Sequence, residues 1–444
     1  MVTYLKENTD LFSWRTATTV VIANMIGTGI FTSLGFQLNE FSSPSVIIFL
    51  WVLGGIVALS GALCYAEIGA RLPRSGGEYN FVREIYHPAA GFVSGWISVT
   101  VGFSAPTAAV AITACSYLRT VFPNLPVSES SVVLVLLIGL IHLSTRENSA
   151  KFQEGVTFIK IAFIFLFIIV AALAVDETQN LSWTLEYADL SSLSGGALAV
   201  TLIFVNYAYT GWNAATYFSG EMSNPGKNLP RSLLLGTAFV TFIYVILNLT
   251  FLYVAPVESL AGQVEVGAIV ANHALGLDGA RVMSVILGAL LVSTISAMTL
   301  SGPRAMQAIG EDFVALRLLS KTNTSGIPYV AICVQMALAI LMILTSSFEQ
   351  IVVFSGALLA LNSLVTVIGA ALLRRREGTA NIAFKMPLYP LPVMLYAGVI
   401  SLTLIYALQN RPSEGIAALI VILFGLVIYF MLENSKGKTL FPPR

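Results

Sequence analysis

The sequence predicts an all-α integral membrane protein with twelve transmembrane helices, and three observations support this prediction. Hydrophobic residues make up 56% of the 444 positions and charged residues only 10%, which no ordinary soluble domain matches. Twelve apolar stretches are long enough, or nearly so, to cross a hydrocarbon core of about 30 Å. Finally, Lys and Arg concentrate in alternate loops.

The twelve predicted spans follow one another along the whole chain, and the fourth and ninth are the shortest. The first contains two glycines and Asn24 and has no cleavage site after it, so we interpret it as a retained helix and not as a signal peptide. The predicted cores are 17–37, 46–64, 89–117, 132–143, 158–175, 198–219, 233–254, 282–299, 330–344, 351–373, 393–408 and 416–432.

The distribution of basic residues predicts the orientation. Of the 23 Lys and Arg residues, nineteen lie in the tails and alternate loops on one side of the predicted membrane. Only Arg119, Arg281 and Arg411 lie in the opposite loops. This asymmetry predicts that both termini are cytoplasmic and that the number of spans is even. We expect a multi-pass protein of the cell (inner) membrane.

No cofactor or metal is predicted. Cys64, Cys115 and Cys333 all fall inside apolar spans, where a thiol behaves as a small hydrophobic group, so neither a disulfide framework nor a metal site is indicated. A phosphate-binding G-x-x-x-x-G-K-[ST] loop is missing from the sequence, which disfavours a nucleotide-driven pump. We expect no nucleic-acid partner either.

Two predicted spans are interrupted at the same depth. The first carries IANMIGTGIF (22–31), and Gly27 lies about 15 Å into a core of about 30 Å. The sixth carries NYAYTGWN (206–213), and residues 207–211 lie about 14 to 20 Å from its start. Both breaks are therefore predicted near the middle of the membrane.

These two spans must run in opposite directions, because the sixth span comes five spans after the first, and each successive span reverses the direction of the chain. That relation is typical of an inverted repeat. It divides the chain into a first repeat (1–175, spans one to five), a second repeat (195–375, spans six to ten) and two appended spans (386–434).

An interrupted helix inside a membrane frees backbone groups that must be buried in protein or must line a wet cavity. Gly27, Thr28 and Gly29 free amide N–H groups at the positive end of a half-helix, where a carboxylate binds well. Carbonyls freed at both breaks can accept from an ammonium group. The pattern therefore indicates an α-amino acid, although a Gly-x-Gly pair is also typical of close helix packing.

Around these breaks the chain resembles the amino acid, polyamine and organocation superfamily of transporters, and within it the L-type amino-acid transporters and their bacterial relatives. Beyond Arg304 the resemblance is limited to hydropathy and layout. The motifs that carry it are IGTGIF (26–31), YAEIGARLPRSGGEYNFVRE (65–84), YAYTGWN (207–213) and EMSNPGKNLPRS (221–232).

The resemblance implies the five-plus-five inverted-repeat fold, with alternating access to a central amino-acid site. In this family the substrate carboxylate would meet the N–H groups of Thr28 and Gly29, with the Thr28 hydroxyl as a further donor. The α-ammonium would meet the carbonyls of Met25, Tyr207 and Thr210. Tyr207 also falls where the family places an aromatic gate, although a tyrosine packed among helices is the alternative.

The predicted substrates are neutral. Spans three, six, eight and ten carry no acidic residue at pocket depth, and the position beside the second break is Asn213. A cationic substrate would lack a counter-ion there, which is costly in a membrane. Thr210 stands where some relatives have glycine, so it narrows the site and favours small side chains, by about 1 to 3 kcal/mol at most.

Lys160 is the one basic residue that falls well inside a span, about 12 Å into the fifth. That depth exceeds the comfortable reach of a snorkelling lysine. Some members of the family have a lysine here, whose ammonium replaces the sodium ion of sodium-coupled relatives and ties the fifth span to the first. We therefore expect sodium independence.

The sequence thus favours a sodium-independent secondary transporter of neutral L-amino acids that works by exchange, with proton-linked symport as the alternative. An amino-acid sensor of the same fold is the alternative from another class, and a membrane enzyme ranks last. The loop 122–131 lacks the cysteine that joins eukaryotic L-type members to a glycoprotein, so we expect no covalent partner subunit.

Overall fold

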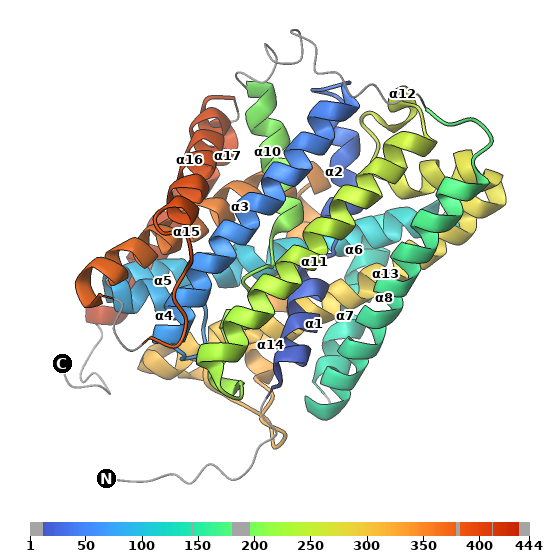
Figure 1. Cartoon of the computed structure of the whole chain (residues 1–444). Helices are drawn as coiled ribbons and strands as arrows, with labels where there is room; N and C mark the ends of the chain where they lie inside the picture. The colour runs from blue at the N-terminus through green and yellow to red at the C-terminus, as the bar shows by residue number, and fades with distance from the viewer. Residues whose placement is uncertain (1–11, 144–145, 180–195, 379–381, 411, 435–444) are drawn as a thin grey trace.

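The computed structural model describes residues 12–143, 146–179, 196–378, 382–410 and 412–434. These residues form a bundle of helices (Figure 1), with one isolated β-bridge between Phe12 and Met222. Nine helices in the described part are long and apolar enough to cross a membrane, and two shorter apolar helices accompany them. The prediction of an all-α, multi-pass membrane protein is confirmed, whereas the number twelve stays a prediction.

Each predicted core lies on one or more of the observed helices. Those helices are α1 (Trp14–Met25), α2 (Gly29–Gln37), α3 (Pro44–Arg71), α4 (Glu78–Ile85), α5 (Pro88–Ile97), η1 (Ser98–Phe103), α6 (Ser104–Arg119), α7 (Val127–His142), α8 (Arg146–Ala174), α10 (Gly196–Tyr209), η2 (Ala214–Glu221), α11 (Pro225–Val254), α12 (Val257–Leu260), α13 (Val266–Asp312), η3 (Val314–Ser320), α14 (Tyr329–Thr345), α15 (Phe348–Glu377), α16 (Leu391–Asn410) and α17 (Pro412–Asn434).

Both predicted breaks are present. The first span is divided between α1 and α2, which leaves residues 26–28 outside both helices. In the sixth span α10 ends at Tyr209, and the chain resumes at Ala214 as the 3₁₀ helix η2. The third span holds an irregularity that the sequence did not predict, the π-helix η1 between α5 and α6.

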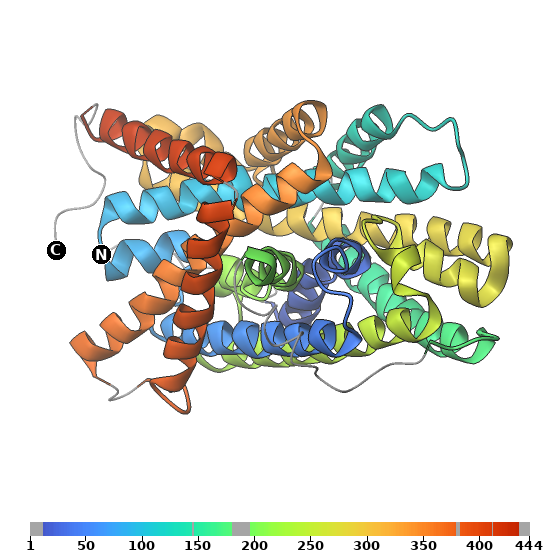
Figure 2. The same cartoon turned by 90° about the horizontal axis from the view of Figure 1, so that it is seen from above.

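The broken spans occupy the centre of the molecule. Seen from above, α2 and α10 stand between one layer that contains α3 and α11 and another that contains α6 and α13 (Figure 2). These two half-helices pack closely, because the Phe36 ring of α2 stacks on the Phe204 ring of α10 with centroids 5.0 Å apart. The Ser33 hydroxyl also donates to the Phe204 carbonyl over 3.3 Å.

A buried ion pair fastens the end of α3. Glu67 pairs with Arg71 one turn later, over 2.8 Å. The same carboxylate accepts from Arg374 of α15 over 2.9 Å and from the Met386 N–H over 2.8 Å. One carboxylate therefore joins α3, α15 and the segment that leads to α16.

A second group of charges closes the face that carries α4, η2 and the end of α13, which we call the α4 face. Asp312 accepts from Arg74 over 2.9 Å, from Arg83 and from the Tyr79 hydroxyl over 2.6 Å. Arg304 pairs with Glu221 over 3.0 Å. These pairs hold α4 and η2 against α13.

The first prediction concerns Glu67. Replacing it with Gln should lower the temperature at which the detergent-solubilised protein unfolds, because Arg71 and Arg374 would face each other without a buried counter-charge, at a cost of about 3 to 5 kcal/mol. Arg375→Gln, at an exposed position of the same cluster of arginines, is the control. Equal melting temperatures for the two variants, measured by fluorescence, would contradict this account.

Candidate functional site

The first break leaves backbone donors free at the start of α2. The chain turns tightly after α1, with the Gly27 N–H donating to the Met25 carbonyl over 2.8 Å. The N–H groups of Thr28 and Gly29 donate to no backbone carbonyl in the described part of the chain. The Thr28 hydroxyl is buried and makes no hydrogen bond of regular geometry among these residues, although it interacts with the Tyr207 side chain. Three unpaired donors thus gather at the positive end of a half-helix.

Gly29 also serves helix packing. A Cβ atom at this position would lie 2.5 Å from the Ala208 Cα atom, so α2 and α10 touch backbone to backbone. A Cβ atom on Gly27 would lie 3.3 Å from the Thr294 methyl group, which is tight but not prohibitive. Packing alone therefore explains why position 29 is glycine, and the unpaired donors are the separate observation that points to a ligand.

The carbonyls released at the first break already have partners. The Met25 carbonyl accepts from the Tyr244 hydroxyl of α11 over 2.5 Å as well as from Gly27. Because a carbonyl oxygen has two lone pairs, a ligand ammonium would have to replace one of these donors. Nothing in the sequence singles out Tyr244, which stands in an apolar span.

Lys160 lies where it contacts the first break. Its side chain is 1% exposed, and its ammonium donates to the Ile26 carbonyl over 2.8 Å and to the Thr294 hydroxyl over 2.7 Å. The Thr294 hydroxyl donates in turn to the Ile26 carbonyl over 2.9 Å. The lysine therefore joins α8 to the released backbone of the first span and to α13.

The second break is closed by its own threonine. Both the N–H and the hydroxyl of Thr210 donate to the Tyr207 carbonyl, over 3.0 and 2.7 Å. Gly211 follows with φ of 98°, and a Cβ atom there would lie 2.8 Å from the Asn24 carbonyl carbon. The left-handed glycine thus brings the two breaks into contact.

Tyr244 connects both breaks. Its hydroxyl oxygen lies 2.5 Å from the Met25 carbonyl and 2.9 Å from the Ala208 carbonyl of α10. A phenol has one proton to donate, so it satisfies one of these two acceptors at a time. The other acceptor is available to a cationic donor.

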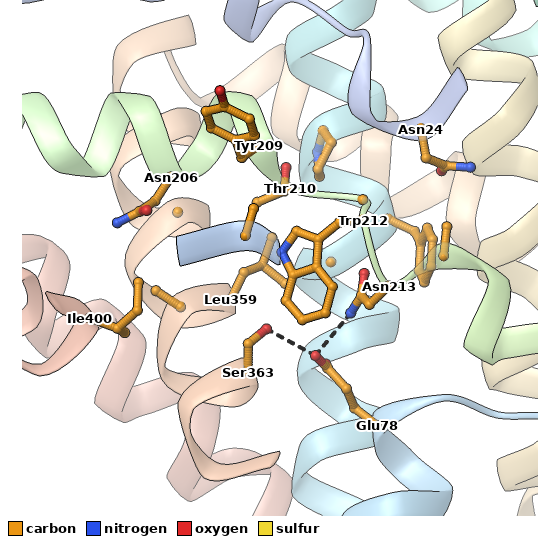
Figure 3. A pocket seen from close by; sticks show the side chains of 18 of the residues that line it. Asn24, Glu78, Asn206, Tyr209, Thr210, Trp212, Asn213, Leu359, Ser363 and Ile400 are labelled. Atoms are coloured by element: carbon orange, nitrogen blue, oxygen red, sulfur yellow. Dashed lines mark hydrogen bonds between the residues drawn. The ribbon is translucent and has the colours of Figure 1, made fainter. Parts of the chain in front are cut away.

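A cavity of about 70 Å³ lies beside the second break (Figure 3). Thr210 and Asn213, both predicted site residues, line it, together with Asn24, Asn206 and Trp212. The other predicted residues, namely Met25, Gly27, Thr28, Gly29 and Tyr207, lie outside its lining. The predicted residues therefore divide between the cavity wall and the backbone of the breaks next to it.

Glu78 is a lining residue that the sequence analysis missed. Its side chain is 1% exposed and accepts from the Asn213 amide and the Ser363 hydroxyl, each over 3.0 Å (Figure 3). Spans three, six, eight and ten contribute no acidic residue to the cavity lining. The Glu78 carboxylate instead comes from α4, which is not one of the predicted spans. Asn213 therefore faces a carboxylate and does not mark the absence of one.

Two glycines turn the chain so that Glu78 reaches the cavity. Gly76 and Gly77 have φ of 116° and 56°, which only glycine adopts readily. Their N–H groups donate to the carbonyls of Tyr217 and Thr216 in η2 over 3.1 and 3.2 Å. Burial raises the pKa of the Glu78 carboxyl, and hydrogen bonds from its neighbours only partly offset this effect.

Metal ligation finds no support in the described residues, where no group of three His, Cys, Asp or Glu side chains could hold an ion. Cys64 and Cys115 are buried free thiols, and Cys333 is an exposed one. Cys333 lies on the outer surface of the apolar helix α14, as a residue that faces lipid would.

Comparisons with known proteins identify the family. A sequence model described as amino acid permease matches residues 12–435. Asc-type amino acid transporter 1 of Homo sapiens is 30% identical, over 98% of this chain and 84% of that protein. The serine/threonine exchanger SteT of Bacillus subtilis is 28% identical, over 95% and 96%.

A third relative, large neutral amino acids transporter small subunit 2 of Homo sapiens, is 26% identical, over 96% of this chain and 80% of that protein. All three printed names describe transport or exchange of amino acids, and all three matches run through both broken spans. The chain therefore belongs to the amino acid permease family, within the amino acid, polyamine and organocation superfamily, and is an amino-acid transporter of the membrane and not an enzyme.

Proposed function

We propose that the protein exchanges small neutral L-amino acids across the cell membrane, without sodium, by alternating access. The observation that carries this proposal is the juxtaposition, at two touching breaks, of unpaired donors on α2 with a surplus of carbonyl acceptors around Tyr244. An α-amino acid presents the complementary pair of charges on adjacent groups.

The carboxylate end would lie at the start of α2. Among the described residues, the N–H groups of Thr28 and Gly29 donate to no backbone carbonyl and the Thr28 hydroxyl makes no hydrogen bond of regular geometry, so a carboxylate would gain their hydrogen bonds without breaking strong ones. Charge-assisted bonds of this kind are about twice as strong as neutral ones.

The ammonium end would lie at the carbonyls of the breaks. The Tyr244 proton serves either Met25 or Ala208, and a ligand ammonium supplies the donor that the other carbonyl lacks. The Tyr207 and Thr210 carbonyls remain further candidates. Tyr244 would then respond to substrate binding by donating to one fixed partner.

Sodium independence follows from the position of Lys160. Its ammonium already places a positive charge on the Ile26 carbonyl and the Thr294 hydroxyl, which are the oxygen ligands that a hard cation prefers. A fixed cation at this place favours exchange, because the site does not need an ion gradient to complete it. The exchanger named among the relatives supports the same mode.

The preference for small neutral substrates rests on the cavity. A volume of about 70 Å³ accommodates about five water-sized groups, which is close to a small amino acid. The Glu78 oxygens already accept hydrogen bonds from Asn213 and Ser363, so a cationic side chain would have to displace these donors to pair with Glu78. Two relatives are named for serine and threonine and for large neutral substrates, and both names refer to neutral amino acids.

The orientation, the twelve spans and the repeat division (1–175, 195–375 and 386–434) belong to the same proposal. Arg74, Arg83 and Arg304 all lie on the α4 face, and the distribution of basic residues supports a cytoplasmic location for this face and for both termini. We further propose that the chain acts without a covalently attached partner subunit. Proton-linked symport is the second candidate, because a buried carboxylate lines the cavity.

The second prediction tests transport itself. In proteoliposomes, entry of labelled alanine or serine should rise several-fold when unlabelled substrate is preloaded and should not depend on sodium. Neutral amino acids should compete, whereas arginine and glutamate should not. Uptake that requires sodium, or competition by arginine alone, would refute the proposal, and binding without any flux would identify a sensor.

The third prediction concerns the carboxylate donors. Thr28→Ala should weaken substrate affinity about 10- to 100-fold without loss of fold, because a hydrogen bond to a charged group contributes about 1.5 to 3 kcal/mol and this hydroxyl makes no other hydrogen bond of regular geometry among the described residues. Thr113→Ala, which removes a buried hydroxyl that bonds only within α6, is the control. Gly29→Val is not a selective test, because it would also separate α2 from α10.

The fourth prediction concerns Lys160. Lys160→Met keeps the length of the side chain but removes the charge, so the first break loses its link to α8. The transport rate should fall more than tenfold while the amount of folded protein in the membrane changes little. Lys227→Met, at an exposed position of α11, should leave the transport rate unchanged. Uptake by Lys160→Met at the wild-type rate would exclude a coupling role.

A further inference from the structure

Glu78 differs from the other buried carboxylates in the part of the chain that the structure describes. Glu67 pairs with Arg71 and Arg374, and Asp312 pairs with Arg74. The hydrogen bonds of Glu78 come only from neutral groups, namely the side chains of Tyr65, Ser98, Asn213, Tyr217, Asn362 and Ser363. A carboxylate buried among neutral donors has no fixed counter-charge to keep it ionised.

We propose that Glu78 is a proton-binding site of the transport cycle, which holds a proton while the α4 face is closed and releases it to that side when the face opens. This inference rests on the proposed function and extends it, because it makes amino-acid movement dependent on a proton. It assigns the proton to a residue outside the membrane-spanning helices, and not to Lys160.

The neighbours of Glu78 can accommodate either protonation state. As a carboxylate it accepts from the Tyr65 hydroxyl over 2.5 Å and from three further donors, which fills about four lone-pair positions. As a protonated acid, Glu78 must donate one hydrogen bond, and the longer of its contacts can provide the acceptor. Ser98, 3.4 Å away, can donate to the Ser94 carbonyl over 3.1 Å and accept from Glu78 with its oxygen.

This adaptability separates Glu78 from Glu67. Guanidinium groups and a backbone N–H surround Glu67, and none of these groups can accept a hydrogen bond. A protonated Glu67 would therefore find no acceptor for its hydrogen bond, whereas a protonated Glu78 has one in Ser98. The contrast identifies one carboxylate as structural and the other as able to titrate.

The surrounding charges do not fix the state of Glu78. The titratable groups nearest to it are the phenols of Tyr65, Tyr217 and Tyr396. The charged residues on the elements packed around it, apart from the exposed Glu84 and Glu311 and the outer arginines of α15, are held in ion pairs. Those paired residues are Glu67, Arg71, Arg74, Arg83, Glu221, Arg304, Asp312 and Arg374.

The contacts of Glu78 couple the proton to the closed state. Its partners lie on four different elements, α3, η1, η2 and α15, so a movement of α4 that opens the α4 face must separate Glu78 from some of them. Burial raises the pKa of Glu78 in the closed state, and access of water would return the pKa toward its ordinary value. The closed state therefore binds the proton more tightly, and opening releases it.

The direction of the pH effect follows from linkage. A raised pKa in the closed state stabilises that state at low pH, and this advantage is lost as the pH rises through the raised pKa. Acid on the α4 side should slow opening to that side, and acid on the opposite side should promote loading of the proton and inward movement of substrate.

The test uses the purified full chain in proteoliposomes that contain a trapped pH-sensitive dye. Exchange of labelled alanine is first measured at a fixed pH. If no exchange occurs, the proposed function itself is refuted, so this step separates a failure of the proposed function from a failure of the inference about Glu78. Addition of external alanine to empty vesicles should then acidify the lumen, and the initial uptake rate should fall several-fold between about pH 5 and pH 8.

Glu78→Gln mimics the protonated acid and should remove both the acidification and the pH dependence, whereas Glu84→Gln, on the exposed side of the same helix, should keep both. If Glu78→Gln retains the wild-type pH profile and acidification, the inference is wrong. Exchange that is indifferent to pH in the wild type also refutes it.

Tyr65→Phe provides an independent variant should Glu78→Gln fail to fold. It removes a donor that favours the carboxylate form, so the midpoint of the pH profile should move to higher pH. A midpoint identical to that of the wild type would overturn the inference.

Discussion

Interrupting a helix inside a membrane releases backbone groups that no water can satisfy, and the centre of this molecule is organised around that constraint. Lys160 and Thr294 satisfy the Ile26 carbonyl, and Thr210 satisfies the Tyr207 carbonyl twice. Tyr244 is shared between the two breaks. Three helices, α8, α11 and α13, thereby supply side chains to two short irregular segments, which explains why the broken spans lie in the middle of the bundle.

At the two breaks, the released carbonyl groups and the released N–H groups differ in how many of them have hydrogen-bond partners. The Met25, Ile26 and Tyr207 carbonyls have side-chain or backbone donors, whereas the released N–H groups of Thr28 and Gly29 have no backbone acceptor among the described residues. In the proposed site, the contacts for a carboxylate would therefore be preformed, whereas the contacts for an ammonium group would have to replace an existing partner. An amino acid would consequently find its carboxylate contacts ready and would have to compete for its ammonium contacts.

Sequence alone predicted the parts of the fold that depend on local composition and depth. The two breaks were found because Gly27 and Gly211 interrupt apolar stretches at the same distance from the membrane surface, and Lys160 was found by the same measure of depth. Glu78 was missed because the search for acidic residues used their depth along a predicted span. Glu78 lies outside the spans, at the start of the short helix α4, and reaches the cavity through the turn at Gly76 and Gly77. Tyr244 and the π-helix η1 have no local signal, since their position depends on neighbouring helices.

The contact between Gly29 and Ala208 has a mechanical consequence. Because no side chain separates α2 from α10 there, and Phe36 stacks on Phe204 further along, the two half-helices form a stiff pair made from different halves of the sequence. If one of these half-helices tilts, the other must tilt with it. In the proposed transport cycle the two breaks would serve as neighbouring hinges, so a substrate that reorients α2 would move α10 together with it.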